Sequence, residues 1–121
     1  MHSLPKSVLL LCAFTLCLLG CKAHTPEPRL LGKPELTLQP ASVKELNTRA
    51  KQTVTIKGEM VEKCPVAGCW FVLKDKTGTV RVDTKSAGFV VTDVPLHTSL
   101  TVTGVVNKGD QTTLKAMGVA Y

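Results

Sequence analysis

Residues 70–83 have the sequence WFVLKDKTGTVRVD, which predicts two strands joined by a tight turn. Apolar and polar side chains alternate on both sides of the turn, as they do in strands that bury one face. Lys76-Thr77-Gly78 marks the turn, because glycine adopts a positive φ at little cost. We therefore expect strands over residues 70–75 and 79–83.

Three further segments have the same alternation: residues 54–60 (VTIKGEM), 100–106 (LTVTGVV) and 112–121. Asn107-Lys108-Gly109-Asp110 predicts a hairpin turn between the last two. Five short strands in about 70 residues are too few for a two-sheet sandwich, and they suit a small closed barrel without exposed edges.

The turn Leu73-Lys74-Asp75-x-Thr77-Gly78 and the Val/Gly-rich strand over 100–106 resemble those of the OB-fold. The resemblance covers residues 54–121 and implies an all-β fold, a five-stranded Greek-key barrel preceded by one short helix. More narrowly, Cys64-x₄-Cys69-Trp70 resembles the signature of an uncharacterised exported bacterial family of OB-like proteins. Neither resemblance brings an established function with it.

The segment before the barrel predicts a tether and then a capped helix. Four prolines, at positions 26, 28, 34 and 40, interrupt regular structure, so residues 21–41 are expected to be a tether. Fully extended, residues 22–41 would span at most about 70 Å. Ser42-Val43-Lys44-Glu45 matches a capping box, which predicts a short helix over 42–49 and a folded domain over 42–121.

Residues 1–20 predict a signal peptide. Lys6 precedes an apolar run over residues 8–19, which is too short to span a membrane as a helix. Leu18-Leu19-Gly20-Cys21 resembles a lipobox, in which the cysteine is lipidated and the chain is cut before it. We therefore expect a lipoprotein of the bacterial cell envelope, anchored through Cys21. In a Gram-negative host, Lys22 as the second mature residue favours the outer membrane, facing the periplasm.

Cys64 and Cys69 remain as a pair after the leader is removed and Cys21 is lipidated. An oxidising compartment favours a disulfide between them. Two alternatives stay open: a metal-handling protein that binds copper or zinc through both thiolates, and a thiol–disulfide redox partner. The other candidate ligands, His24 and His97, are not placed near the pair by the sequence.

A candidate ligand-binding face follows from the strand alternation. Phe71 and Leu73 are assigned to the core, which turns neighbouring side chains outward. The outward set combines an aromatic ring with positive charge and consists of Trp70, Lys57, Lys74 and Arg81. OB proteins bind single-stranded nucleic acid or oligosaccharide on such a surface. The alternative is that Trp70 covers a disulfide and that the lysines only protect strand edges.

The whole sequence favours binding over catalysis. The chain has 15 basic and 9 acidic residues, and only Lys6 lies in the leader, so the mature charge of 14 − 9 = +5 favours anionic surfaces. The sequence offers no Ser–His–acid or Cys–His arrangement, paired carboxylates or glycine-rich phosphate loop. We expect a non-catalytic module without a cofactor, whose partner is the membrane and an unknown protein, oligosaccharide or anionic ligand. Nucleic acid is not expected outside the cytoplasm.

Overall fold

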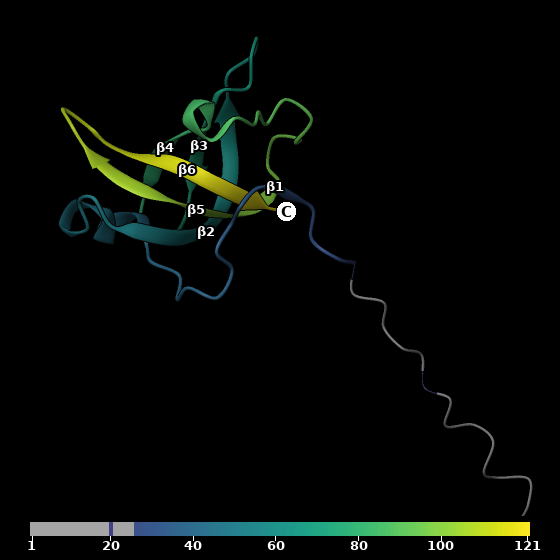
Figure 1. Cartoon of the computed structure of the whole chain (residues 1–121), viewed down its shortest axis with the longest axis horizontal. Helices are drawn as coiled ribbons and strands as arrows, with labels where there is room; N and C mark the ends of the chain where they lie inside the picture. Colours follow the sequence, from purple (N-terminus) through teal and green to yellow (C-terminus); the bar gives the residue numbers. More distant parts are fainter. Residues whose placement is uncertain (1–19, 21–25) are drawn as a thin grey trace, which may run out of the picture.

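Strands β2 to β6 close into a barrel, and β1 adds one extra strand outside it (Figure 1). The computed structural model describes residue 20 and residues 26–121, so Cys21 and all but the last residue of the predicted signal peptide (residues 1–20) lie outside the described residues. The strands are β1 (Leu30–Gly32), β2 (Thr53–Lys63), β3 (Trp70–Lys74), β4 (Thr79–Asp83), β5 (Ser99–Lys108) and β6 (Thr112–Ala120). Two 3₁₀ helices, η1 (Val43–Thr48) and η2 (Lys85–Ala87), complete the described elements.

The order around the barrel is β6-β4-β3-β2-β5, and β5 pairs again with β6. β4 and β6 are parallel, while the other neighbouring pairs are antiparallel. This arrangement confirms the predicted five-stranded OB-like barrel. Within the described part of the chain, no helix is long and apolar enough to cross a bilayer.

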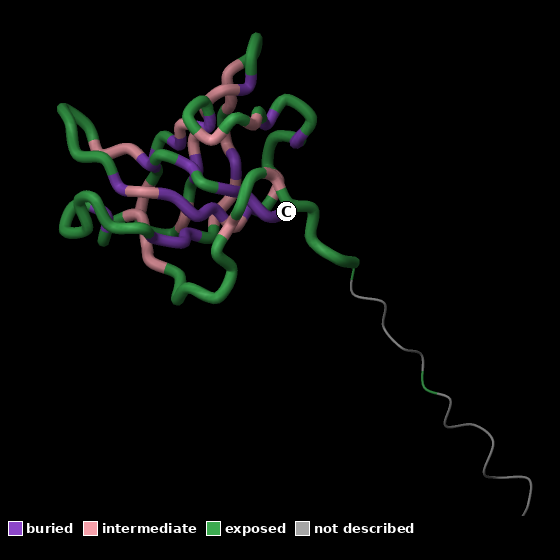
Figure 2. Tube along the Cα trace, viewed as in Figure 1, coloured by how far each residue is buried: buried purple, intermediate pink, exposed green. Residues whose placement is uncertain are grey.

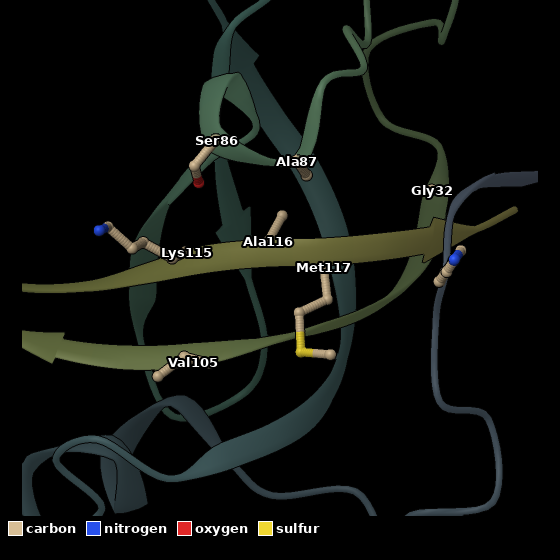
Figure 3. A pocket seen from close by; sticks show the side chains of 8 residues that line it. Gly32, Ser86, Ala87, Val105, Lys115, Ala116 and Met117 are labelled. Atoms are coloured by element: carbon tan, nitrogen blue, oxygen red, sulfur yellow. The ribbon is translucent and has the colours of Figure 1, made fainter.

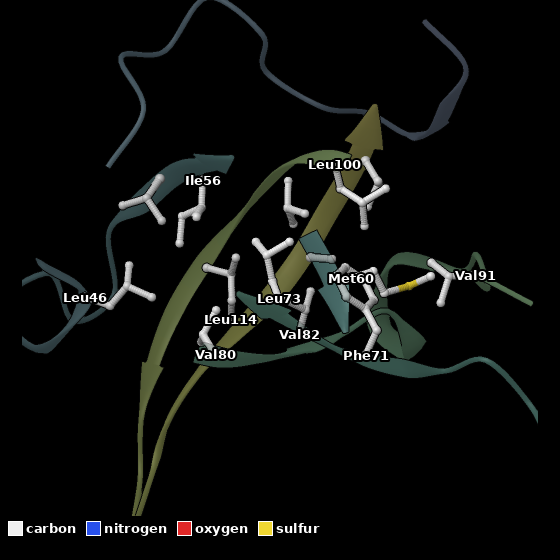
Figure 4. Close-up of a cluster of buried hydrophobic side chains, with 14 of the residues drawn as sticks. Leu46, Ile56, Met60, Phe71, Leu73, Val80, Val82, Val91, Leu100 and Leu114 are labelled. Atoms are coloured by element: carbon white, nitrogen blue, oxygen red, sulfur yellow. The ribbon is translucent and has the colours of Figure 1, made fainter. Parts of the chain in front are cut away.

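The core occupies the barrel interior, where side chains from every barrel strand meet (Figure 4). Buried and more exposed positions alternate along β3 and β4, whereas β2, β5 and β6 each include a run of three buried residues; Figure 2 shows burial along the described residues. Phe71 and Leu73 are fully buried, as predicted, and Val80 and Val82 join them from β4. Because aromatic residues make up only 4% of the chain, the remaining core is mainly aliphatic.

The predicted tether over residues 21–41 is wrong for its second half. β1 pairs with the end of β6, with Leu30 opposite Ala120. Further along, the amide of Ala41 donates to the carbonyl of Thr55 at 2.8 Å. We call residues 30–41 the N-terminal strap. Prolines exclude regular structure there, but they do not prevent the segment from docking on the barrel.

A ring of hydrogen bonds fixes the strap to β2 and β5. The Thr55 hydroxyl donates to the carbonyl of Glu35 at 3.0 Å, and the amide of Glu35 donates to Thr103 Oγ1 at 2.9 Å. The two threonine hydroxyls lie 3.0 Å apart, so each can be satisfied inside the ring. Buried hydroxyls are stable only when they are bonded. The strap therefore explains why Thr55 and Thr103, which point out of the barrel, are 1% and 0% exposed.

The predicted capped helix over 42–49 forms as the 3₁₀ helix η1, and its predicted cap is wrong. Among the described residues, the Ser42 side chain makes no capping bond. Asp75 supplies the cap instead, since the amide of Val43 donates to Asp75 Oδ2 at 2.8 Å. A carboxylate is a stronger acceptor than the Ser42 hydroxyl, and the β3–β4 turn positions it beside the start of η1. Leu46 anchors the helix in the core at 1% exposure.

Asp75 also holds its own turn together. Its Oδ1 accepts hydrogen bonds from the Thr77 amide at 2.7 Å, the Thr77 hydroxyl at 2.7 Å and the Gly78 amide at 3.1 Å. Burial raises the pKa of this carboxyl, but the hydrogen bonds from Thr77, Val43 and Gly78 outweigh burial and hold the pKa below its usual 3.8. One carboxylate thus joins the turn to η1.

Asp75→Ala should therefore lower the free energy of unfolding by about 2–3 kcal/mol at pH 7, because several backbone amides lose their acceptor. Asp75→Asn keeps one oxygen for the turn but loses the bond to Val43, so we expect about half that loss. Since the folded pKa lies below the unfolded one, the contribution is present above pH 4 and is lost as the pH falls through the folded pKa. Urea unfolding at pH 7 and pH 3 measures both effects.

The exposed neighbour Lys76 provides the control, and Lys76→Ala should leave the stability unchanged at both pH values. Equal stabilities of Asp75→Ala and Lys76→Ala at pH 7 would contradict the capping role of Asp75.

Candidate functional site

A groove of about 670 Å³ lies on the outer face of β3 and β4, beside the turn between β5 and β6. Its lining is mostly polar and consists of Asn47, Glu62, Trp70, Val72, Thr79, Val80, Arg81, Asp110, Gln111 and Thr112. In OB-like barrels, ligands bind on the face of the second and third barrel strands and against the loop before the last strand. In this barrel, the second and third strands are β3 and β4, and the loop before the last strand is the β5–β6 turn.

A stacked pair of side chains forms part of this groove. The guanidinium carbon of Arg81 lies 4.6 Å from the centroid of the Trp70 ring. The two residues are diagonal neighbours, because Arg81 pairs directly with Val72 and Trp70 with Asp83. Such a cation–π contact contributes about 0.5–1 kcal/mol at an exposed site. It also orients the guanidinium, whose N–H donors lie in one plane.

The structure brings together two of the four predicted face residues. Trp70 and Arg81 both line the groove. Lys74 ends β3, whereas Trp70 begins it, so the lysine lies at the other end of that strand. Lys57 lines a different hollow, beside Asp75.

The predicted basic face is wrong in its charge. Glu59, Glu62 and Asp83 lie on the same outer face, because their register partners in β3 point outward: Lys74, Val72 and Trp70. These carboxylates balance the three predicted cations. Glu62 reaches this face because the register of β2 shifts between Met60 and Glu62.

Inside the groove, carboxylates outnumber cations. Arg81 is accompanied by Glu62 and Asp110, which gives a net charge of −1 for the lining. The amides of Asn47 and Gln111 add hydrogen-bond donors and acceptors without charge. Thr112 donates to Asn47 Oδ1 at 3.1 Å and so helps to orient that amide. The groove therefore suits polar ligands of low net charge better than polyanions.

The two cysteines lie at opposite ends of the β2–β3 loop, which has the sequence CPVAGC over residues 64–69. Gly68 has a φ of +58° and packs against Thr92, whose Oγ1 would lie 2.5 Å from an added Cβ. Its carbonyl accepts from the Val91 amide at 3.0 Å, while the Thr84 amide donates to the Cys69 carbonyl at 2.9 Å. The Cys69 end of the loop is therefore anchored to the segment after β4.

Both cysteines of the described chain are free thiols, so the predicted disulfide is not formed in the structure. Hydrogen bonds from the amide of Ala67, then that of Val66, lower the pKa of Cys64 from 9.0 to about 7. Burial works in the opposite direction, and the Gly68 amide and the Cys69 thiol add smaller contributions that also lower the pKa. The disulfide stays a prediction for the oxidised protein.

Cys64 and Cys69 would supply two sulfur ligands to a metal ion. Within residues 26–121, no group of three or more His, Cys, Asp or Glu side chains is arranged to hold an ion. His97 contacts Glu59 instead, with Nδ1 2.6 Å from Oε1, and His24 lies outside the described residues. A closed zinc site normally has four ligands, whereas two thiolates suit a soft ion such as Cu(I).

A second hollow, of about 620 Å³, lies beside β1 (Figure 3). Met117 and Val105 form its apolar floor, while Lys33 and Lys115 supply positive charge. Met117 is 42% exposed. The sequence did not predict this hollow, because it forms only where the strap and η2 meet β6.

The closed barrel, its strand order and the position of the groove define an OB-like β-barrel. No protein-family model matches the chain, and no curated protein matches it. Among solved structures, the chain is similar to the hypothetical protein YgiW from E. coli, with a TM-score of 0.55 and 20% sequence identity. The match covers 74% of this chain and 94% of that one. At this identity the similarity concerns the fold alone.

Proposed function

We propose that the protein is a non-catalytic binding module of the bacterial cell envelope, anchored through lipid at Cys21. Its ligand site is the groove that contains Trp70 and Arg81. The observation that carries this proposal is the stacked pair in a polar groove, at the position where barrels of this shape bind their ligands.

A neutral oligosaccharide fits the groove better than a polyanion does. A polyanion would bring its charges close to Glu62 and Asp110. A sugar hydroxyl can donate to these carboxylates and accept from Arg81 or Asn47. This balance of donors and acceptors supports a hydroxyl-rich ligand.

The anchored strap supports a short connection to the membrane. Because β1 begins at Leu30, only residues 22–29 separate it from Cys21, and they span at most about 28 Å. The barrel is then held close to the bilayer, on the side of the hollow with Lys33 and Lys115. Near an anionic surface, each lysine adds about 1 kcal/mol of attraction.

Trp70 is the single tryptophan of the chain, so its fluorescence reports on the groove directly. A panel of neutral tetrasaccharides should contain one that changes this fluorescence in a saturable manner. Arg81→Ala should weaken that binding about tenfold, which corresponds to about 1.4 kcal/mol. Lys74→Ala, on the same face but away from the groove, should leave the affinity unchanged.

A single-stranded oligonucleotide of eight thymidines tests the competing ligand class. We expect it to bind more weakly than the active tetrasaccharide. Tighter oligonucleotide binding that is lost in Lys74→Ala and Lys57→Ala would overturn the proposed ligand class. An Arg81→Ala variant that binds as tightly as the wild type would overturn the site.

A further inference from the structure

The Cys64–Cys69 loop differs chemically from the groove, because it carries two free thiols. We propose that Cys64 and Cys69 form a thiol–disulfide exchange site, in which Cys64 attacks an accessible disulfide and Cys69 resolves the mixed disulfide. The substrate class is a disulfide that protrudes from a small molecule or from another exported protein.

The two thiols lie close together. The loop ends are held together by the hairpin, since the amide of Cys64 donates to the carbonyl of Trp70 at 3.0 Å. The two side chains are within hydrogen-bond contact of each other. A resolving thiol must lie this close to attack its partner's sulfur.

The environment of the Cys64 sulfur favours its thiolate. The amides of Val66, Ala67 and Gly68 all donate toward it, because the chain turns tightly over residues 65–67. Converging backbone amides form a site that stabilises an anion. The pKa of about 7 agrees with this geometry, since both favour the thiolate form of Cys64.

The tip of the loop is accessible to a partner. Residues 65–67 are exposed, and the Val66 side chain at the loop tip is 88% exposed. The opposite end of the loop is fixed, because Gly68 and Cys69 bond to the segment over 84–91. Both cysteines are partly exposed, so a partner can approach the loop and contact Val66.

The proposed reaction is two successive exchanges. The Cys64 thiolate attacks one sulfur of the substrate disulfide, so the substrate's S–S bond breaks and one thiolate leaves. Cys69 then gives its proton to solvent and attacks the Cys64 sulfur, which releases the second substrate thiolate. Two electrons pass from the pair to the substrate, whose two thiolates take up protons from solvent to become thiols, and the pair ends as a disulfide.

Oxidised glutathione is the probe for this reaction. The mature protein is extracted in detergent, reduced, freed of reductant and mixed with excess probe, and the products are identified by mass spectrometry after acid quenching. The wild type should form the Cys64–Cys69 disulfide and retain no glutathione. Cys69→Ser should retain one glutathione, on Cys64.

The Cys64→Ser variant should react several-fold more slowly than Cys69→Ser at pH 7. Hydrogen bonds from the loop amides lower the pKa of Cys64 to about 7, which raises its thiolate fraction at neutral pH. The reaction of Cys69→Ser should rise with pH around a midpoint near 7. Lys76→Ala, at an exposed position of the β3–β4 turn, should exchange like the wild type.

Three outcomes would overturn the proposal. Equal rates for Cys64→Ser and Cys69→Ser would show that Cys64 is not the attacking thiol. Glutathione retained on wild-type Cys64 would show that Cys69 does not resolve it. An oxidised pair that excess reduced glutathione fails to reduce would be a structural disulfide.

Discussion

The Cys21→Ser variant is expected to leave the membrane fraction, whereas the wild type should remain there after washing with high salt. Several acyl chains make an anchor effectively permanent, because each buried CH₂ contributes roughly 0.8 kcal/mol. Without them, the described barrel offers only surface contacts such as those of Lys33 and Lys115, which salt screens. Fractionation followed by immunoblotting measures the shift.

Cys12→Ser is the matched control, since Cys12 belongs to the predicted leader and precedes the proposed cleavage site. This variant should stay in the membrane fraction. Mass spectrometry of the wild type should also give an acylated Cys21 as the first residue. Salt-resistant membrane binding of Cys21→Ser, or an unmodified sulfur at the mature terminus, would contradict the lipid anchor.

The barrel could be predicted because strand alternation is a direct consequence of burial on one face. Phe71 and Leu73 are fully buried as expected, and β4 has the predicted bounds, Thr79–Asp83. The strap could not be predicted in this way. Its attachment depends on contacts distant in sequence, such as that of Glu35 with Thr103, and docked segments without periodicity leave no local signal.

The candidate site was predictable only in part. Trp70 and Arg81 could be assigned outward from alternation alone, and the structure places them in contact. Glu59 was within reach of the same argument, since it lies two residues after Lys57 in the same strand. Glu62 could not be assigned outward in this way, because the register shift before it breaks the alternation. Groove residues from turns, such as Asp110, carry no such pattern.

Gly118→Val is expected to lower the free energy of unfolding by about 3–4 kcal/mol and to release the N-terminal strap. An added Cβ at Gly118 would fall on the backbone of Lys33 and Pro34, closer than real Cβ atoms approach their neighbours. β6 is fixed in the barrel by both β4 and β5, so the strap must yield. The hydroxyls of Thr55 and Thr103 then lose Glu35 and become accessible to water.

Urea unfolding measures the loss, and hydrogen exchange locates it. The amides of Glu35 and Ala41, which donate to the barrel in the wild type, should lose their protection in Gly118→Val. Gly109→Val is the control, because an added Cβ at Gly109 meets only the Gln111 carbonyl, at 3.9 Å. If the strap amides were already unprotected in the wild type and the two variants unfolded alike, the strap would not be part of the folded domain. The connection to Cys21 would then comprise residues 22–41 rather than 22–29, and the barrel would no longer be held close to the bilayer.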